Sequence, residues 1–366
     1  MTERRRFLIF LLVAGGLLGA TAAVSYLDAS GAASGNAYEK GVAALLLAGA
    51  NVGNVKNYDE RVLQKVLIQN DSRRIDTIVL GSSRAWQVNN CSCMHLTDPN
   101  RTFLNHAASL ASLEDYIAIL DLYEAKGALP RRVIIGADPW ILNANSSLSR
   151  WKRLEPEYRQ GLARIGVPDP EGTPARALSA LEGAGSLISR DVVIASAYRL
   201  LMNRQSYFPT VQEELDVTLK ERDGSIRYDA ATRTRTPEEV DADARAYAAE
   251  TPIFGLGEFT RIDDGARERF EATVEHLQAR NTTVVLFLAP YHPIVYDTIA
   301  ADSRYASVGM VESYLTAYAA SREITVVGSY DPHRLNLSSA DFYDATHPKR
   351  EVVDRLFENA AGPGMD

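Results

Sequence analysis

Five short segments rich in β-branched residues constrain the fold of this chain more than any other feature. They cover residues 77–80, 102–105, 132–135, 283–288 and 324–327. Continuous apolar runs of this length are typical of strands buried on both faces of a parallel sheet. Helical segments such as 112–126 separate the first three runs, so the order is βαβαβ, which requires crossover connections. The sequence therefore predicts an α/β fold.

Composition is consistent with a globular chain that does not bind nucleic acid. The 366 residues are 46% hydrophobic, which is enough for one large domain or for one domain with a sizeable insertion. The formal net charge is -8. Neutralising phosphates requires a basic face, so we expect no nucleic-acid partner.

The amino terminus has the pattern of a membrane anchor. Arg4, Arg5 and Arg6 precede the uncharged stretch 7–27, which as a helix is long enough to cross a hydrocarbon core of about 30 Å. Arginines before such a stretch favour a cytoplasmic amino end. We therefore expect residues 1–30 to be a single-pass signal anchor in the inner (cytoplasmic) membrane, with the main domain periplasmic or otherwise extracytoplasmic.

The same amino-terminal segment is compatible with three alternatives. Ala20, Thr21 and Ala22 offer small residues at which a signal peptide could be cleaved, and the protein would then be secreted. Residues 3–8 partly match a twin-arginine export signal. A cytosolic protein with a buried amino-terminal helix is the third alternative, but a packed core does not explain three adjacent arginines.

The two cysteines do not indicate a disulfide framework or a metal site. Cys91 and Cys93 are separated by one residue, which makes a mutual bridge geometrically awkward. A metal site would recruit His95, but these candidates lack the second distant pair that zinc spacing requires. We expect no metal and no diffusible cofactor.

The regular alternation is interrupted in two places. Residues 31–75 are expected to form a juxtamembrane linker and a helix, and 76–366 the α/β domain. Within that domain, residues 141–280 break the alternation and are expected to form a large helical insertion that caps the fold. One of its helices should follow Thr236 as the capping residue and present a charged, solvated face.

Ser83 is the candidate nucleophile. It follows the first apolar run in the small-residue turn Gly81, Ser82 and Ser83. A strand that ends in such a turn leaves a hydroxyl at the carboxyl edge of the sheet, where open α/β folds place their sites. The same residues also approximate the nucleophile elbow of α/β-hydrolases. The α/β-hydrolase fold places several strands before its elbow, whereas here Ser83 follows the first apolar run, so the order of elements disfavours that fold.

Asp344 and His347 are the candidate partners of Ser83. A serine hydroxyl needs a base to take its proton, and the base needs a third group that fixes its tautomer. Their three-residue separation lets the carboxylate reach one ring nitrogen while the other faces Ser83. Pro348 favours the first turn of a helix at 349–359. The sequence thus predicts a Ser83–His347–Asp344 triad.

Several nearby residues have two interpretations. His106 and His292 are alternative bases near predicted strand ends, and His292 is also a candidate substrate contact or structural loop residue. Arg84 offers a guanidinium fork to an anionic substrate group, or it pairs with Asp138.

The aromatic residues Trp86 and Trp140 are similarly ambiguous. Each is a possible sugar-stacking surface or a member of the core, and buried aromatic residues are the commoner case.

These motifs together resemble the SGNH or GDSL hydrolase superfamily over residues 77–140 and 283–359. The D-x-x-H pattern at 344–347 is the strongest match, and residues 81–83 resemble the first block. Ser82 replaces the usual aspartate there, a variation also found in the D-alanyl-transfer protein of teichoic acid synthesis. The resemblance implies a flavodoxin-like three-layer parallel sheet with Ser83 as nucleophile.

The two middle blocks depart from the pattern of that superfamily. Residues 105–109 occupy the position of the oxyanion-hole glycine, and 136–139 lie near the expected Gly-x-Asn-Asp. The resemblance implies that the Ser83 N–H and this loop, including Asn105 and Ser109, hold the oxyanion. The missing block-three asparagine removes one side-chain donor.

The resemblance extends most closely to membrane-anchored members that handle acyl groups on cell-surface polymers. It implies a serine-dependent acyl esterase or O-acyltransferase acting on a cell-envelope or secreted polysaccharide. It also implies other envelope acyl-transfer proteins as partners. The alternative is a non-catalytic protein that binds glycan or scaffolds such a complex. The residues alone do not separate hydrolysis from transfer.

Overall fold

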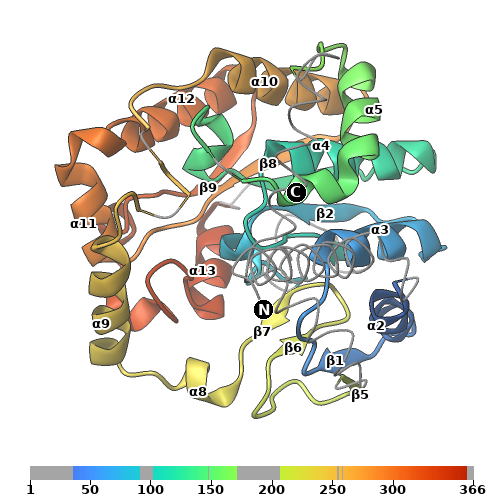
Figure 1. Cartoon of the computed structure of the whole chain (residues 1–366), viewed down its shortest axis with the longest axis horizontal. Coiled ribbons are helices and arrows are strands. Elements are labelled where there is room, and N and C mark those ends of the chain that lie inside the picture. Colours follow the sequence, from blue (N-terminus) through green and yellow to red (C-terminus); the bar gives the residue numbers. More distant parts are fainter. Residues whose placement is uncertain are drawn as a thin grey trace, which may run out of the picture.

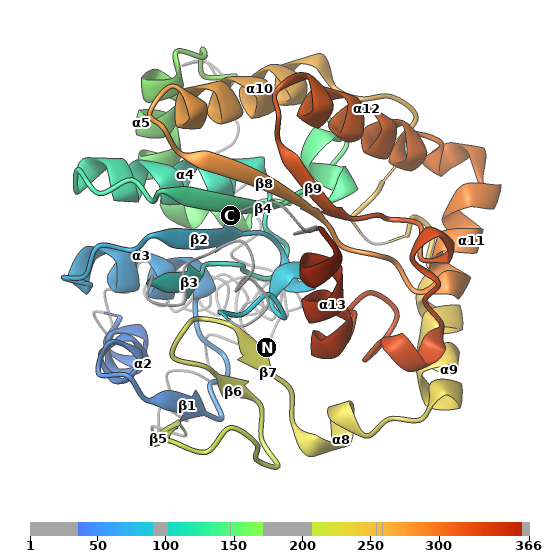
Figure 2. The ribbon, with the colours of Figure 1, turned by 180° about the vertical axis from the view of Figure 1, so that it is seen from behind.

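The computed structural model describes residues 36–90, 102–146, 148–170, 207–253, 255–257 and 259–360. Its main element is a five-stranded parallel sheet of order β3-β2-β4-β8-β9. These strands are β2 (Thr77–Leu80), β3 (Phe103–Asn105), β4 (Arg132–Gly136), β8 (Thr283–Leu288) and β9 (Thr325–Gly328). All five predicted runs form strands of this sheet, so the predicted α/β class is confirmed (Figures 1 and 2).

Helices cover both faces of the parallel sheet. Alternate strand residues point to opposite faces, and Ile78 and Val133 enter one core while Val79 and Ile134 enter the other. The first core is completed by residues of α4 (Leu113–Ala125), α10 (Asp264–Gln278) and α12 (Ser307–Ser321). The second is completed by α13 (Arg350–Ala360). Burial on both faces explains why the strands are continuous apolar runs.

Local capping signals set several helix boundaries. Ser112 and Asp115 form a capping box at the start of α4, and Thr236 and Glu239 form another at α9. The other α-helices among the described residues are α2 (Ala37–Leu47), α3 (Glu60–Asn70), α5 (Glu155–Ile165), α8 (Ala230–Arg233), α9 (Pro237–Ala248) and α11 (Pro293–Ala301). The short 3-10 helices described are η1 (Ser83–Ala85), η2 (Pro139–Leu142), η3 (Arg150–Leu154), η4 (Ser303–Tyr305), η5 (His333–Leu335) and η6 (Ser339–Asp341).

A small antiparallel sheet was not expected from the sequence. Its order is β5-β1-β6-β7, formed by β5 (Phe208–Thr210), β1 (Asn51–Gly53), β6 (Leu219–Lys220) and β7 (Ile226–Arg227). Figure 2 shows it beside the β3 edge of the large sheet. Strands of two or three residues carry no readable periodicity.

The small sheet changes the expected domain layout. Val52, in the segment expected to be a linker, pairs with Pro209 and Lys220 of the inserted segment. The described part of the insertion is therefore partly β-structure rather than only helical, and the described part of the linker belongs to the folded domain. The expected membrane anchor at 1–30, Cys91, Cys93 and His95 lie outside the described residues. Within the described ranges, no helix combines the length and apolar character needed to cross a bilayer.

Candidate active site

The turn after β2 presents Ser83 at the carboxyl edge of the parallel sheet. Gly81 permits this turn, because a Cβ atom there would lie 2.6 Å from the Cβ of Ala85. The Ser82 hydroxyl accepts a hydrogen bond from the Arg84 backbone N–H at 3.2 Å and caps η1. Ser83 is therefore the first residue of a short helix whose entry is fixed by its neighbours.

Three side chains from opposite ends of the chain form one hydrogen-bonded series. His347 Nε2 lies 2.9 Å from Ser83 Oγ, and His347 Nδ1 lies 2.7 Å from Asp344 Oδ2. The backbone N–H groups of Thr346 and His347 donate to Asp344 Oδ1 at 2.9 and 3.0 Å. The loop before α13 thus holds the Asp344 carboxylate and the His347 imidazole within hydrogen-bonding distance of each other, and the imidazole within hydrogen-bonding distance of Ser83.

The electrostatics of Asp344 suit an orienting carboxylate. Burial by itself would raise its pKa, but the charge and hydrogen bond of His347 and the two backbone N–H donors outweigh burial and lower the pKa to about 2. Asp344 is therefore ionised at neutral pH. An ionised acceptor at Nδ1 keeps the proton on that nitrogen and leaves Nε2 free to accept from Ser83.

Aromatic residues enclose the imidazole of His347. The Trp86 ring lies nearly parallel to it, at 9° and 6.2 Å between centroids, and the Trp86 Nε1–H donates to Ala107 O at 3.2 Å. Tyr228 meets the imidazole edge-on at 64° and 6.2 Å. The pKa of Tyr228 is raised well above its usual value, mainly by burial and secondly by the negative charge of Asp344. The phenol therefore stays neutral.

Sequence reasoning missed Tyr228. It follows β7 in the inserted segment, and the Ile226 N–H donates to Trp86 O at 3.1 Å, which joins the small sheet to η1. No motif surrounds Tyr228 in the sequence; only the pairing of the small sheet brings it to the site. Trp140, the other aromatic candidate, is a core residue whose Nε1–H donates to Ala111 O at 3.0 Å.

The structure corrects the expected role of Asn105 in an oxyanion hole. Its Nδ2 donates to the carbonyl oxygens of Ala85 and Val88 at 2.8 and 2.7 Å, and its Oδ1 accepts from the Ala107 N–H at 2.8 Å. The side chain is also buried. Asn105 therefore ties η1 to the end of β3 and has no free donor to offer a substrate.

Ser109 needs the same correction. Its hydroxyl and its backbone N–H both donate to the Glu60 carboxylate, at 2.9 Å for the hydroxyl. The N–H groups of His106 and Ala108 donate to Val79 O and Gly81 O at 2.9 and 3.0 Å. The hydrogen-bond donors of loop 105–109 named here are thus already bonded within the protein. The Ser83 N–H, by contrast, has no acceptor among the residues that the structure describes.

Arg84 is a structural cation under the nucleophile turn rather than a substrate contact. Its Nη1 donates to Asp138 Oδ1 at 2.8 Å, its Nη2 donates to Ala289 O, and its guanidinium carbon lies 3.8 Å from the Tyr291 ring centroid. Arg84 is 2% exposed. Burial raises the pKa of Asp138, and this rise is opposed by Arg84 and by hydrogen bonds from Ser82. The pairing alternative is therefore the one observed.

The two alternative bases do not reach Ser83. His106 lies between Gln64 Oε1 and Tyr123 OH, at 2.5 and 2.6 Å, and burial followed by the charge of Lys220 lowers its pKa to about 3. It is a neutral core histidine.

His292 is also a structural residue in the fold. It is fully buried, and its Nδ1 accepts from the Ile294 N–H at 3.2 Å, which caps α11. Its Nε2 lies 3.4 Å from Asp241 Oδ1 without hydrogen-bond geometry. Burial lowers the pKa of His292. The expected contact between His292 and substrate therefore does not fit its position.

Comparison of the chain with known protein families, curated proteins and solved structures finds no match. Across the described ranges, His, Cys, Asp and Glu residues form no cluster of three or more that could hold a metal ion.

Proposed function

We propose that this chain is a serine-dependent acyl esterase or O-acyltransferase with an SGNH-type, flavodoxin-like fold. The observation that carries the proposal is the hydrogen-bonded series Ser83–His347–Asp344. The strand order supports it, because the five parallel strands numbered along the chain follow 2-1-3-4-5, the flavodoxin-like order. In such folds, ligands bind beyond the carboxyl ends of the strands at the point where the order reverses. Ser83 follows β2, which flanks that point.

In the proposed mechanism, His347 Nε2 takes the proton of Ser83 Oγ as that oxygen attacks the acyl carbonyl carbon. Asp344 stabilises the imidazolium that forms. His347 then returns the proton to the leaving oxygen, the ester bond breaks, and an acyl group remains on Ser83. Water or an acceptor hydroxyl, deprotonated by His347, attacks this acyl-enzyme and releases Ser83.

The Ser83 N–H is the proposed backbone donor to the oxyanion. A single donor of this kind contributes on the order of 10²–10³ in rate. The bonding of Asn105 and Ser109 leaves loop 105–109 without a comparable free group. A second donor is therefore expected from the substrate side, for example a hydroxyl of the sugar that carries the acyl group.

The biological setting is also a proposal. A polysaccharide or acylated glycan substrate and envelope acyl-transfer partners rest on the family resemblance. A single-pass location in the inner membrane rests on Arg4–Arg6 and on the uncharged stretch 7–27. Secretion after signal cleavage is the alternative.

One observation favours a second candidate function. The middle loop has no free donors, and Asp138 stands as a buried ion-pair partner near the position where the superfamily carries an asparagine donor. A protein that binds glycan beside Ser83, or scaffolds an acyl-transfer complex, would need Trp86 and Tyr228 but not the oxyanion hole.

Fluorophosphonate labelling separates the two candidates. The active enzyme should become labelled at Ser83, and turnover of p-nitrophenyl acetate should be lost in Ser83→Ala and His347→Ala. A matched control is Ser313→Ala, because the Ser313 hydroxyl is exposed on α12 and bonds only locally. Glycan retention by an unlabelled, folded wild type would favour the scaffold. Labelling at another residue would contradict the proposed nucleophile.

A further inference from the structure

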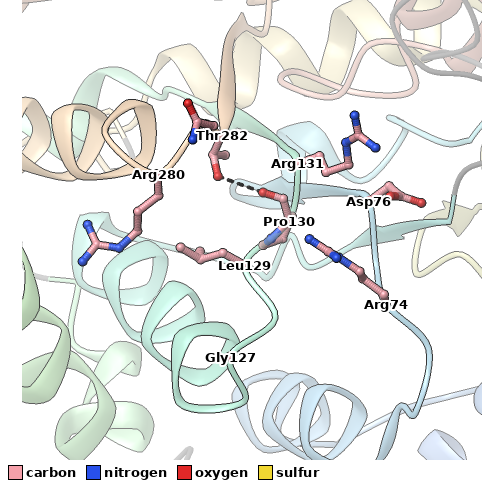
Figure 3. A pocket seen from close by; sticks show the side chains of 9 residues that line it. Arg74, Asp76, Gly127, Leu129, Pro130, Arg131, Arg280 and Thr282 are labelled. Carbon is pink, nitrogen blue, oxygen red and sulfur yellow. Dashed lines mark hydrogen bonds between the residues drawn. The ribbon is translucent and has the colours of Figure 1, made fainter.

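A cavity lies at the amino edge of the parallel sheet, opposite the edge that carries Ser83. Its volume is about 490 Å³, and Figure 3 shows the residues that line it. Thr77 of β2, Arg132 of β4 and Thr283 of β8 are neighbours in register. The residues just before these strands, Asp76 and Arg131 among them, therefore meet at one edge. We call this cavity the amino-edge pocket.

Arginines dominate the charge of the amino-edge pocket. Arg74, Arg131 and Arg280 line it, and Asp76 is the one carboxylate among its lining residues. Figure 3 shows Arg74, Asp76 and Arg131 on one side of Pro130 and Arg280 on the other. In a chain of net charge -8, this is a local excess of positive charge.

Two of these arginines are not used by the fold. Asp76 Oδ2 accepts from the backbone N–H and the hydroxyl of Thr102, both at 3.1 Å. Arg280 Nη1 lies 3.0 Å from His276 Nδ1, and Arg280 Nε lies 3.5 Å from Glu124 Oε1. The guanidinium groups of Arg74 and Arg131, both exposed, have no ion pair or hydrogen bond with any residue of the described ranges. Their donors are available to a ligand.

The remaining lining adds little that would attract another kind of ligand. The Thr282 hydroxyl donates to Pro130 O at 2.9 Å, so it is already used (Figure 3). Leu129 and Pro130 supply a small apolar part. Guanidinium forks match oxyanions in geometry, and a cavity of this size holds a small organic ligand.

We propose that the amino-edge pocket binds a phosphate-bearing ligand through Arg74 and Arg131. A phosphate group offers a different pair of oxygens to each of two guanidinium forks and carries more negative charge than a carboxylate, which offers one such pair. The phosphate could belong to a soluble metabolite or to a lipid headgroup. The proposal does not depend on the chemistry at Ser83, because the two sites lie at opposite edges of the sheet.

Calorimetric titration of the full chain in neutral detergent with inorganic pyrophosphate tests this proposal. Wild type should bind, and Arg74→Ala and Arg131→Ala should each weaken binding on the order of tenfold. Arg304→Ala is the matched control, since Arg304 is a half-exposed arginine paired with Asp302 elsewhere on the surface. Its affinity should equal that of wild type.

Titrations with two further ligands identify the kind of group that binds, and the pyrophosphate titration itself can overturn the site. Tighter binding of dihexanoyl phosphatidylglycerol than of pyrophosphate would assign a lipid headgroup, and the reverse order a soluble phosphate; both support the proposal. Equal affinity for malonate, a dicarboxylate, would overturn the preference for phosphate. No binding by folded wild type, or equal affinity in both arginine variants, would overturn the site itself.

Discussion

The two edges of the parallel sheet use charged residues in different ways. At the carboxyl edge, Arg84 is 2% exposed and pairs with Asp138, and Asp344 pairs with His347. At the amino edge, Arg74 and Arg131 are exposed, and no residue of the described ranges pairs with their guanidinium groups. Buried charges must be paired to be tolerated, whereas exposed ones need not be. The carboxyl edge is therefore preorganised by its own charges, and the amino edge is open to a ligand.

The largest expected effect is the loss of ester turnover in Ser83→Ala. Without the Oγ atom no acyl-enzyme forms, and turnover should fall on the order of 10⁵-fold. Burst and steady-state kinetics with p-nitrophenyl acetate measure this, with Ser313→Ala as the control. If turnover survived in Ser83→Ala, Ser83 would not be the nucleophile, and the carboxyl edge could not be called the catalytic edge of the sheet.

Asp344→Asn should have the next largest effect on turnover. An amide at this position no longer stabilises the imidazolium and disturbs the tautomer of His347, so the rate should fall by about 10⁴-fold. The variant should still be labelled slowly at Ser83 by fluorophosphonate. A rate within tenfold of wild type would show that the carboxylate does not orient the base.

The free energy of unfolding of Arg84→Met tests the difference in burial between the two edges. It leaves Asp138 buried without its partner, and we expect the free energy of unfolding to fall by about 3–5 kcal/mol. Arg131→Met at the other edge should change it by less than about 0.5 kcal/mol. Urea denaturation followed by circular dichroism compares the two variants. Equal losses would contradict the assigned difference in burial.

The lowered pKa of Asp344 predicts a smaller, pH-dependent contribution to stability. Because its folded pKa of about 2 lies below the unfolded value of 3.8, the unfolded state binds more protons between these values. The stabilisation is complete above about pH 4 and is lost as pH falls towards 2. Allowing for partial exposure, it amounts to about 1–2 kcal/mol.

Urea denaturation of wild type and Asp344→Asn at pH 5, 4, 3 and 2.5 measures this contribution. The difference in unfolding free energy between the two proteins should shrink as the pH falls. A constant difference over this range would mean that Asp344 is not held in its charged form by His347.

The smallest effect is expected from amino-edge variants on ester turnover. Arg74→Ala and Arg131→Ala should change the rate with p-nitrophenyl acetate by less than about twofold, because distant sites without shared partners act independently. A matched measurement with pyrophosphate present should give the same rate. A larger change would mean that the two edges are coupled.

Much of the fold could be predicted because its signals are local. The apolar runs match β2, β4 and β8 closely, and Thr236 caps α9 as expected. The three members of the triad were named from residue type and spacing, and the structure brings them into contact. The finer role of each neighbour was not readable, because Asn105, Ser109 and Arg84 each have donors that several partners could use.

The small sheet and the amino-edge pocket show why the rest could not be predicted. Val52 pairs with Pro209 and Lys220, and strands this short have no pattern that reveals their partner. Arg74, Arg131 and Arg280 are distant in sequence and meet only because β2, β4 and β8 start in register.

The sequence by itself determined the α/β class, the strand positions and the candidate nucleophile, base and acid. These depend on local composition, on spacing and on the rule that sites lie beyond the carboxyl ends of parallel strands. Tertiary structure decided which polar groups are consumed by the fold and which remain available. That outcome depends on burial and on contacts between distant segments, and neither quantity exists until the chain has folded.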